Sequence, residues 1–384
     1  MRDFKNIGIV GAGSMGIGIA QIASTSGCKV FLYDQDIEIA QNALKKLKKI
    51  LDRLIEKKRI NSNKRDEILS NIKIVSSLND LSGSNLIIEA IIENLEIKKD
   101  LFSKLETIVN KECIIASNTS SLSITSLASS LKNPSNFIGI HFFNPAPLMP
   151  LVEIIPALQT NIDLSNSIRN LLLSWDKLPV IAKDTPGFIV NRIARPFYSE
   201  ALRIYDEQIA DFATIDFAMK ELGGFKMGPF ELMDFIGNDV NYAVTESVFN
   251  SFYYDPKYKP SLTQKQYASA GWLGRKTNKG YYDYNSSRKY VPSKDIKLLN
   301  SIFERILVML INDAVDAFYL GIASKEDIDL AIIKGVNYPK GLIAWGEEKT
   351  FSWVEKKMDE LYENYKEDRY RCSSLVRLWG NSKK

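Results

Sequence analysis

The chain contains a single histidine, His141, in a position that favours chemistry over packing. His141 follows the apolar stretch "FIGI", and Glu153 comes shortly after it in a second apolar stretch, "PLVEII". If the two stretches are neighbouring strands, the carboxylate can orient one imidazole nitrogen while the other acts as a general base near neutral pH. Ser120, in "SNTSSL", adds a hydroxyl that can hydrogen-bond a substrate oxygen. A core histidine satisfied by backbone partners is the alternative.

A glycine-rich turn near the start of the chain predicts a dinucleotide site. The segment "NIGIVGAGSMGIGIAQIASTSGCKVFLYDQD" reads as a β-branched strand, a glycine turn, a helix and a second strand that ends at Asp34. In this context Gly11 permits the tight turn, Gly13 lets the backbone approach a pyrophosphate, and Gly16 lets the helix pack close to the strand. The N-terminus of the helix then attracts the phosphates.

The carboxylate of Asp34 bears on which nicotinamide dinucleotide is bound. At the end of the second strand it can hydrogen-bond both ribose hydroxyls and repel a 2′-phosphate, which favours NAD over NADP. Nicotinamide beside a general base and hydroxyl donors predicts oxidation of a secondary alcohol, or the reverse reduction of a ketone. Acyl transfer by a serine triad is disfavoured, because neither Ser120 nor Ser121 lies in a GxSxG elbow.

Alternating strands and helices in the first part of the chain must position these groups. Further strands are predicted in "NLIIEAI", "CIIASNTSS" and "FIGIHFFNP", with a helix in "NLEIKKDLFSKLETIV". This alternation is typical of a doubly wound, parallel α/β sheet of the Rossmann type, whose ligands bind at the carboxyl ends of the strands. Glu93, Ser117 to Ser121, and His141 to Asn144 all come at or after predicted strand ends, so we expect them to line one crevice.

A strongly basic helical segment follows the second strand. Leucines and isoleucines recur there at helical spacing, with lysines and arginines between them. Such a charged amphipathic helix is most often a solvated face. The alternative is that some of its basic residues bind an anionic group of the substrate. The candidates are Lys48, Lys49, Lys57, Lys58 and Arg59.

Length and composition limit the class of protein. With 384 residues, 45% of them hydrophobic, the chain can form two or three domains with ordinary cores. A net charge of +4 does not indicate a nucleic-acid binder. Three widely spaced cysteines without a CxxC pair argue against a disulfide framework or a zinc site and favour a reducing compartment, so we expect the cytoplasm. The early first strand leaves no room for a signal peptide, and no apolar run reaches the ~18 residues that span a bilayer.

Five motifs, in this order and spacing, resemble those of the L-3-hydroxyacyl-CoA dehydrogenases. They are "GAGSMG", "EAIIENLEIKK", "SNTSSL", "HFFNPAPLMPLVEII" and "KDTPGFIVNR". The resemblance runs from about Lys5 to about Tyr284. It implies that the chain oxidises an L-3-hydroxyacyl-CoA with NAD, or reduces the 3-oxoacyl-CoA, with His141 as the general base and Glu153 as the residue that orients it.

The resemblance also implies roles for further residues. Ser120 and Asn191 would contact the 3-oxygen of the substrate and its thioester region. The basic helical segment lies near the CoA moiety in relatives, which favours a binding role for it. From the residues alone, Pro186 and Gly187 break the chain before a helix whose first turns contain Asn191, and a buried helix-capping role is the alternative. The residues expected to bind the cofactor are Gly11, Gly13, Ser14, Met15, Gly16, Asp34, Glu93, Lys98, Ser120 and Asn144.

The second half of the chain is helical in its periodicity and contains an internal repeat. Residues 192–228 align without a gap on residues 305–341, at a constant offset of 113. The second copy has Glu304 where the first has Asn191, so we expect the second copy to be structural. Single-copy relatives dimerise through this module, so the two copies can pair within one chain, and an oligomer is possible but not required. The predicted domains are a Rossmann-type NAD-binding domain over 1–184 and two all-α copies of a C-terminal domain over 185–288 and 289–384.

Two features narrow the expected substrate. The tandem arrangement and the motif "LGRKTNKGYYDY" resemble the bacterial branch that acts on 3-hydroxybutyryl-CoA or 3-hydroxyadipyl-CoA, and we expect a short acyl chain. A dicarboxylic chain such as adipyl would require a basic residue, which the sequence pattern does not single out. The alternatives are an oxidoreductase of another hydroxy acid, such as a free sugar acid, and a non-catalytic dinucleotide-binding protein. A complete set of His141, Glu153, Ser120 and Asn191 disfavours the non-catalytic protein.

Overall fold

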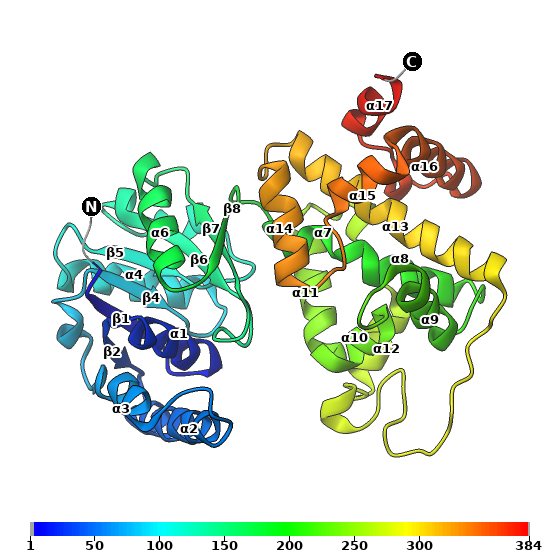
Figure 1. Ribbon diagram of the computed structural model, residues 1–384. Helices are drawn as coiled ribbons and strands as arrows, with labels where there is room; N and C mark the ends of the chain where they lie inside the picture. The colour runs from blue at the N-terminus through cyan, green and yellow to red at the C-terminus, as the bar shows by residue number, and fades with distance from the viewer. Residues whose placement is uncertain (1–3, 383–384) are drawn as a thin grey trace. The chain divides into compact units, whose positions relative to one another are not determined.

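The computed structural model describes residues 4–382 and separates the chain into two compact units, divided between Phe188 and Ile189 (Figure 1). The first unit is an α/β sandwich and the second is built from helices. No helix within residues 4–382 combines the length and the apolar character needed to cross a membrane.

The first unit is organised around one sheet, in the strand order β3-β2-β1-β4-β5-β6-β7-β8. All neighbouring pairs are parallel except β6 and β7, which are antiparallel. The carboxyl ends of β1, β4, β5 and β6 therefore meet at one edge, which confirms the predicted Rossmann-type sheet. The strands are β1 (Asn6–Val10), β2 (Lys29–Tyr33), β3 (Ile72–Val75), β4 (Leu86–Glu89), β5 (Ile114–Ser117), β6 (Phe137–Phe142), β7 (Leu151–Pro156) and β8 (Leu178–Ile181).

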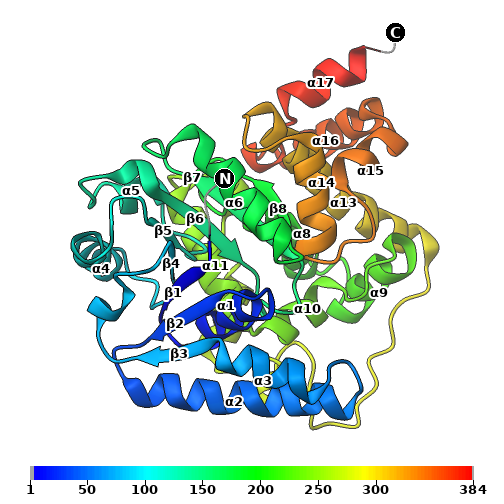
Figure 2. The ribbon, with the colours of Figure 1, turned by 60° about the vertical axis from the view of Figure 1, so that its left-hand side comes forward.

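Helices cover both faces of this sheet (Figure 2). On one face, Ile19 of α1, Leu47 of α2 and Leu172 of α6 share a buried core with strand residues such as Ile88. On the other face, α4 and α5 pack together and α5 contacts β6. The helices are α1 (Ser14–Thr25), α2 (Ile37–Glu56), α3 (Ser62–Ser70), α4 (Leu95–Ile108), α5 (Ile124–Ala128) and α6 (Ile162–Ser174), with 3-10 turns η1 (Leu78–Leu81) and η2 (Pro134–Asn136).

Two strands of this sheet were not expected from the sequence. β3 pairs with β2 and β8 pairs with β7, each along four residues. Lys73 interrupts the apolar run in β3 and Pro179 interrupts it in β8, whereas the equally short β4 and β5 begin with uninterrupted apolar residues. The predicted basic segment does form helices, α2 and α3, with Leu47 and Leu51 buried on one side of α2.

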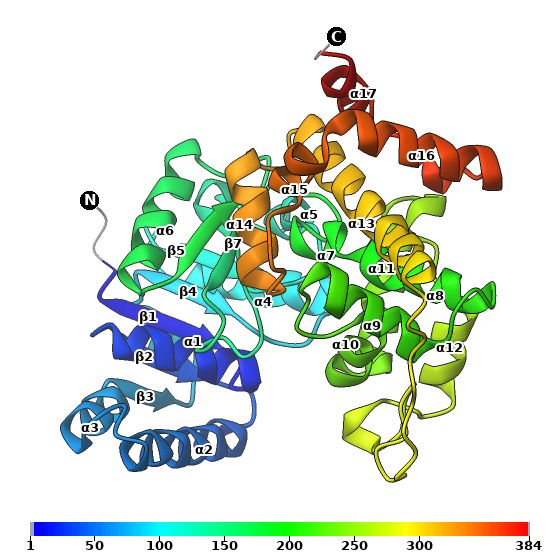
Figure 3. The same ribbon diagram turned by 45° about the vertical axis from the view of Figure 1, so that its right-hand side comes forward.

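The second unit packs around its longest helix, α13, against which α8, α9, α15, α16 and α17 all lie (Figure 3). The helices are α7 (Val190–Ile193), α8 (Arg195–Asp206), α9 (Phe212–Gly223), α10 (Pro229–Ile236), α11 (Asn238–Ser251), α12 (Leu262–Ser269), α13 (Ile296–Tyr319), α14 (Lys325–Gly335), α15 (Leu342–Lys349), α16 (Phe351–Tyr365) and α17 (Ser374–Asn381), with 3-10 turns η3 (Pro256–Tyr258), η4 (Arg275–Thr277) and η5 (Asp368–Tyr370).

Helix boundaries in this unit recur at the offset seen in the sequence. Helices α9 and α14 begin at positions that differ by this offset, Phe212 and Lys325, and so do α10 and α15, while α8 and α13 end at positions that differ by it. The correspondence continues past the aligned residues, since α11 and α16 begin at the same offset, at Asn238 and Phe351, and α12 and α17 begin within one position of it. The recurrence of helix boundaries therefore extends past the segments that align in the sequence, close to the C-terminus.

One hydrogen-bonding arrangement is repeated atom for atom. The carboxylate of Asp216 accepts hydrogen bonds from the backbone N–H groups of Phe230 and Glu231, at 2.8 and 2.9 Å. The carboxylate of Asp329 accepts from the N–H groups of Ile343 and Ala344, at 2.8 and 3.0 Å. All three positions keep the offset of the aligned segments. Each aspartate thus caps the N-terminus of the following helix, α10 or α15.

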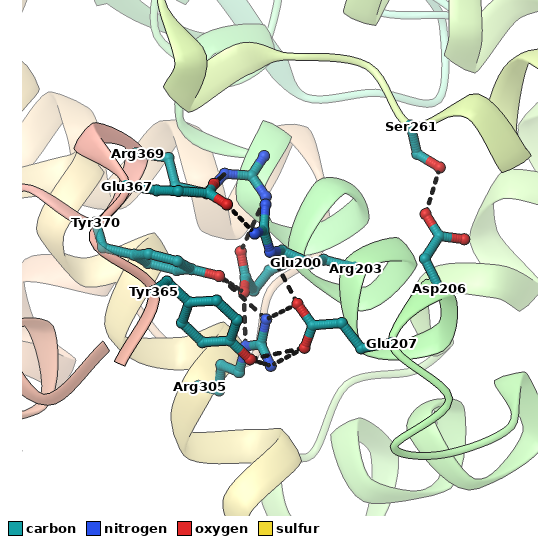
Figure 4. Close-up of polar contacts among 10 residues, drawn as sticks. All are labelled: Glu200, Arg203, Asp206, Glu207, Ser261, Arg305, Tyr365, Glu367, Arg369 and Tyr370. Carbon is teal, nitrogen blue, oxygen red and sulfur yellow. Dashed lines mark hydrogen bonds and ion pairs between the residues drawn. The ribbon is translucent and has the colours of Figure 1, made fainter. Parts of the chain in front are cut away.

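Ion pairs join the two halves of the second unit (Figure 4). Nε of Arg305 on α13 lies 2.6 Å from Oε1 of Glu200 on α8, and Nη1 lies 2.9 Å from Oε2 of Glu207. Arg192 is the counterpart of Arg305 in the aligned segments. It lies before α8 and pairs with Asp316 on α13, at 3.3 Å. The two arginines therefore reach across to each other's half of the unit.

Candidate functional site

The glycine turn between β1 and α1 has the backbone geometry of a phosphate cradle. Gly11 has a φ of +100°, which other residues rarely adopt, and a Cβ on it would collide with the carbonyl oxygen of Ala90. A Cβ on Gly16 would collide with the carbonyl oxygen of Gly11, so this glycine is required mainly by the turn and less by the strand below it. A Cβ on Gly13 would meet no atom within 4 Å, which leaves its backbone open to a ligand.

A cavity of about 820 Å³ opens beside this turn. Asp34 lies on its wall, and one carboxylate oxygen of Asp34 accepts a hydrogen bond from the N–H of Ala12 at 2.7 Å. Asp34 is therefore fixed against the glycine turn. Helix α1 begins at Ser14 with Gly13 as its N-cap, so its unpaired N–H groups are at the cavity. The residues of the predicted cofactor set that line this cavity are Gly11, Gly13, Ser14, Met15 and Asp34.

His141 and Glu153 are direct cross-strand partners on β6 and β7. Nδ1 of His141 lies 2.7 Å from Oε2 of Glu153, and the two residues are 5% and 0% exposed. The rings of Phe143 and Phe188 lie 4.5 and 5.8 Å from the imidazole ring, centroid to centroid. Because His141 and Glu153 are both buried, water competes little for Nδ1, and Nε2 is the nitrogen available for proton exchange.

Glu93 organises the loop that contains Ser120. Its Oε1 accepts hydrogen bonds from the Thr119 hydroxyl at 2.6 Å, the Ser120 N–H at 3.0 Å and the Ser121 hydroxyl at 2.8 Å. Burial alone would raise the pKa of Glu93, but the charge of Lys98 and these hydrogen bonds outweigh it and hold that pKa below its usual value. Glu93 is therefore an ionised hub that fixes the Ser120 loop.

Lys98 connects Glu93 to a second carboxylate, that of Glu89. Nζ of Lys98 lies 2.5 Å from Oε1 of Glu89 and 3.3 Å from Oε2 of Glu93, and the Lys98 side chain is 1% exposed. Glu89, at the end of β4, also accepts from the Ser117 hydroxyl at 2.6 Å and from the N–H of Ile91 at 2.7 Å. The ammonium group of Lys98 is thus held between two carboxylates.

Two further contacts attach the Ser120 loop to its surroundings. The side chain of Asn118 accepts a hydrogen bond from the N–H of Phe142, next to His141, at 2.9 Å. Asp184 accepts from the N–H groups of Ile124 and Thr125 at the start of α5, at 3.0 and 2.7 Å. The loop is therefore held at both of its ends.

Asn144 lies on a second cavity of about 730 Å³, which also borders Gly13 and Ser14. Helix α2 forms the far wall of this cavity with Asn42, Ala43, Leu47 and Ile50, and with one lysine, Lys46. The basic residues named from the sequence as candidates are not among its lining residues, and Lys48, Lys49, Lys57, Lys58 and Arg59 are exposed.

Asn191 belongs to the second unit and lies in its first helix, α7. The sequence predicted that Asn191 lies in the first turns of a helix. Its carbonyl oxygen accepts a hydrogen bond from Nε of Arg195 at 3.0 Å. Within the first unit, three groups lie at the carboxyl ends of the parallel strands. They are the His141–Glu153 pair, the Glu93–Lys98–Ser120 network and the glycine turn with Asp34.

The sequence analysis included Ser117 and Thr119 in the expected crevice but missed Glu89, which also supports this network. Glu89 is 0% exposed and ends an otherwise apolar strand. A carboxylate inside such a run requires hydrogen-bonding partners, and this requirement was the available signal. The identity of the partner, Lys98 on α4, depends on the packing of that helix and was not visible in the local pattern.

Comparison with known proteins identifies the family. The family model "3-hydroxyacyl-CoA dehydrogenase, NAD binding domain" matches residues 6–185. The model "3-hydroxyacyl-CoA dehydrogenase, C-terminal domain" matches twice, over residues 187–284 and 302–383.

Curated relatives and solved structures match in the same way. The 3-hydroxyadipyl-CoA dehydrogenase of Escherichia coli (strain K12) is 34% identical, with 98% of this chain and 98% of the relative covered. The 3-hydroxybutyryl-CoA dehydrogenase of Bradyrhizobium diazoefficiens is 38% identical over 76% of this chain and 98% of its own length. The crystal structure of a 3-hydroxybutyryl-CoA dehydrogenase from Escherichia coli K12 gives a TM-score of 0.93 at 33% identity and covers 98% of both chains. These matches confirm the resemblance seen in the motifs, and the chain belongs to the 3-hydroxyacyl-CoA dehydrogenase family.

Proposed function

We propose that the chain catalyses the NAD-dependent interconversion of L-3-hydroxyacyl-CoA and 3-oxoacyl-CoA. The observation that carries this proposal is the buried contact between His141 and Glu153, 2.7 Å long, at the ligand-binding edge of a Rossmann-type sheet. Bound NAD supplies the hydride acceptor for the oxidation and, when reduced, the hydride donor for the reverse direction.

Side chains of the chain itself supply the other groups that the reaction needs. His141 removes the proton of the 3-hydroxyl through Nε2, and Glu153 stabilises the imidazolium that forms. Ser120 and Asn191 hydrogen-bond the 3-oxygen and the thioester region of the substrate. In the reductive direction His141 returns the proton to the 3-oxygen.

The cofactor in this proposal is NAD rather than NADP. The open backbone at Gly13 and the N-terminus of α1 suit a pyrophosphate, and Asp34 suits a ribose with two free hydroxyls. Ser14, Met15, Gly11 and Gly16 complete the turn. We assign Glu93, Lys98, Ser120 and Asn144 to the nicotinamide side of the cofactor.

For the substrate, we propose a short-chain acyl-CoA, with 3-hydroxybutyryl-CoA as the first candidate. Relatives named 3-hydroxybutyryl-CoA dehydrogenase at 38 to 41% identity support it. The second candidate is 3-hydroxyadipyl-CoA, supported by the relative that is covered along 98% of both chains. We place part of the CoA moiety in the cavity beside α2, where Lys46 offers a cation to its phosphates.

We further propose that 1–184 is the NAD-binding domain and that 185–288 and 289–384 are two copies of one helical domain, the second structural. The recurrence of helix boundaries and of the aspartate caps supports this division. The ion pairs of Arg192 and Arg305 support pairing of the copies within the chain, so that an oligomer is optional. The odd number and wide spacing of the cysteines, at positions 28, 113 and 372, support a cytoplasmic location.

A direct assay tests the proposal. Purified protein is mixed with acetoacetyl-CoA and NADH, and the loss of NADH absorbance is followed, with free acetoacetate and NADPH as controls. We expect turnover only with the CoA thioester and a strong preference for NADH. Binding of NADH without turnover of any acyl-CoA would refute the proposed activity.

A further inference from the structure

The side chain of Arg195 is buried in the second unit without an acidic partner. Arg195 is 5% exposed, and its guanidinium group makes two hydrogen bonds, to the carbonyl oxygen of Asn191 at 3.0 Å and to the hydroxyl of Thr245 at 3.1 Å. The ring of Tyr198 lies 4.9 Å from its central carbon. Among the described residues of the second unit, no carboxylate forms an ion pair with Arg195.

Other buried arginines of this unit are neutralised. Arg192, Arg305 and Arg369, whose side chains are 3%, 10% and 6% exposed, each lie within 4.0 Å of a carboxylate oxygen of Asp316 or Glu200. A buried cation is stable only when it is paired, because its desolvation is not repaid by neutral groups alone. Burial accordingly lowers the pKa of Arg195. The charge of Arg195 is therefore uncompensated within the described part of the second unit, and an anion bound beside it would be stabilised.

Uncharged groups surround the one hydroxyl that Arg195 contacts. Thr245 donates to the carbonyl oxygen of Asn241 at 2.9 Å and accepts from the amide of Gln264 at 3.2 Å. Thr245, Asn241 and Gln264 are 3% exposed or less. This polar network positions the guanidinium group but leaves its charge uncompensated.

The location of Arg195 indicates which anion it can receive. Its Nε donates a hydrogen bond to the backbone carbonyl oxygen of Asn191. The proposed function places Asn191 at the reacting end of the acyl group. The phosphates of CoA are separated from that end by the whole pantetheine arm. In a six-carbon dicarboxylic acyl group, by contrast, the far carboxyl carbon is only three bonds from the carbon that carries the hydroxyl.

We propose that Arg195 binds the distal carboxylate of a dicarboxylic 3-hydroxyacyl-CoA, which favours the second of the two candidate substrates, 3-hydroxyadipyl-CoA, over 3-hydroxybutyryl-CoA. This inference rests on the proposed function. It assigns to Arg195 a specificity role, with a charge-assisted hydrogen bond that a monocarboxylic chain cannot form. A site built to bind a polar group discriminates strongly against the analogue that lacks it, because the buried partner is then left unpaired.

The test compares two substrates in the full-length enzyme and two variants. 3-Hydroxyadipyl-CoA and 3-hydroxybutyryl-CoA are oxidised with NAD by the wild type, by Arg195→Met, which keeps the length and removes the charge, and by Arg195→Lys, which keeps a cation. We expect the wild type to prefer the dicarboxylic substrate, and Arg195→Met to lose about 100-fold in kcat/KM for it while changing about threefold or less for the other. Arg195→Lys should retain part of the preference.

A structural arginine would give a different result, with kcat/KM for both substrates falling together in Arg195→Met, and that outcome overturns the inference. Wild-type activity on 3-hydroxybutyryl-CoA with none on 3-hydroxyadipyl-CoA overturns it too, while the proposed function stands. Inactivity on both substrates instead refutes the proposed function.

A second measurement needs no variant, in case Arg195→Met does not fold. Adipyl-CoA and hexanoyl-CoA have acyl chains of equal length and differ at the distal end, where only the first has a carboxylate. We expect adipyl-CoA to inhibit the wild type at a concentration about tenfold lower than hexanoyl-CoA. Equal inhibition constants would overturn the inference.

Discussion

The ammonium group of Lys98 lies 2.5 Å from the carboxylate of Glu89, and both side chains are almost completely buried, at 1% and 0% exposure. Nζ of Lys98 also lies 3.3 Å from the carboxylate of Glu93. Glu93 in turn accepts a hydrogen bond from the backbone N–H of Ser120. A buried ion pair of this kind fixes geometry, since neither charge has another environment available to it. Lys98 therefore fixes the position of Glu93 and, through it, the loop that contains Ser120.

Loss of Lys98 should destabilise the protein more than loss of the whole pair. Lys98→Met leaves the Glu89 carboxylate buried without its counter-charge, and we expect the free energy of unfolding to fall by about 3–5 kcal/mol. The double variant Glu89→Gln, Lys98→Met removes both charges and should regain at least half of that loss. Urea unfolding followed by circular dichroism measures both values. Equal losses in the single and double variants would contradict a tight pair.

The decrease in the free energy of unfolding at acid pH should depend on Glu93. Its pKa lies below the usual value in the folded protein, against about 4.3 for an unperturbed glutamate. Ionised Glu93 thus contributes stability above the unfolded-state pKa, and this contribution is lost as the pH falls through the lower, folded-state pKa. Lys98→Met removes the main opposing charge, so the folded-state pKa of Glu93 should rise toward the unfolded-state value, and stability should depend less steeply on pH in this range.

Urea midpoints measured between about pH 3 and pH 7 test this sign. The matched control is Glu93→Gln, which cannot titrate and should show a flatter dependence over the same range. A pH dependence in Lys98→Met that coincides with that of the wild type would show that Lys98 does not set the ionisation of Glu93.

The sequence predicted the parts of this site that depend on local patterns. The glycine turn, the position of Asp34 and the strand carrying His141 follow from the spacing of residues along short segments, and each is found as predicted. The pairing of His141 with Glu153 required a guess that two apolar stretches are neighbours, and the antiparallel register of β6 and β7 settles it.

Long-range packing accounts for what the sequence pattern left open. Glu89 and Lys98 meet because α4 returns across the sheet to the end of β4, and no periodicity specifies that contact. Arg195 carries no local signal either, because an arginine near a helix start is usually solvated, and only its burial beside Thr245 distinguishes it. Of the basic residues in α2, Lys46 lines the cavity, and the packing of α2 decides which of its positions does so.

Replacement of His141 should remove catalysis and leave cofactor binding intact. His141→Gln keeps a hydrogen-bonding group beside Glu153 but cannot accept a proton, so we expect kcat to fall at least about 100-fold. The dissociation constant of NADH, measured by fluorescence titration, should change little, because His141 is not among the residues that line the glycine-turn cavity. Near-normal turnover would remove His141 from its proposed role.

Asp34 should discriminate between the two dinucleotides. Asp34→Ala removes the acceptor for the ribose hydroxyls and also the repulsion of a 2′-phosphate, so NADH binding should weaken by about tenfold or more while NADPH binding is unchanged or improved. Asp34→Asn is the control, because it can still accept a hydrogen bond from Ala12 N–H and preserve the turn. Equal weakening of both dinucleotides in Asp34→Ala would indicate that Asp34 acts only on the turn.

The two aspartate caps of the second unit should contribute unequally to stability. Asp216 is completely buried and accepts a third hydrogen bond from the hydroxyl of Tyr282 at 2.8 Å, whereas Asp329 is partly exposed. We expect Asp216→Ala to lower the free energy of unfolding by about 3 kcal/mol and Asp329→Ala by about 1–2 kcal/mol. If the second copy is structural, Asp329→Ala should keep wild-type kcat/KM at a temperature where it remains folded. A loss of turnover in folded Asp329→Ala would assign the second copy a part in catalysis.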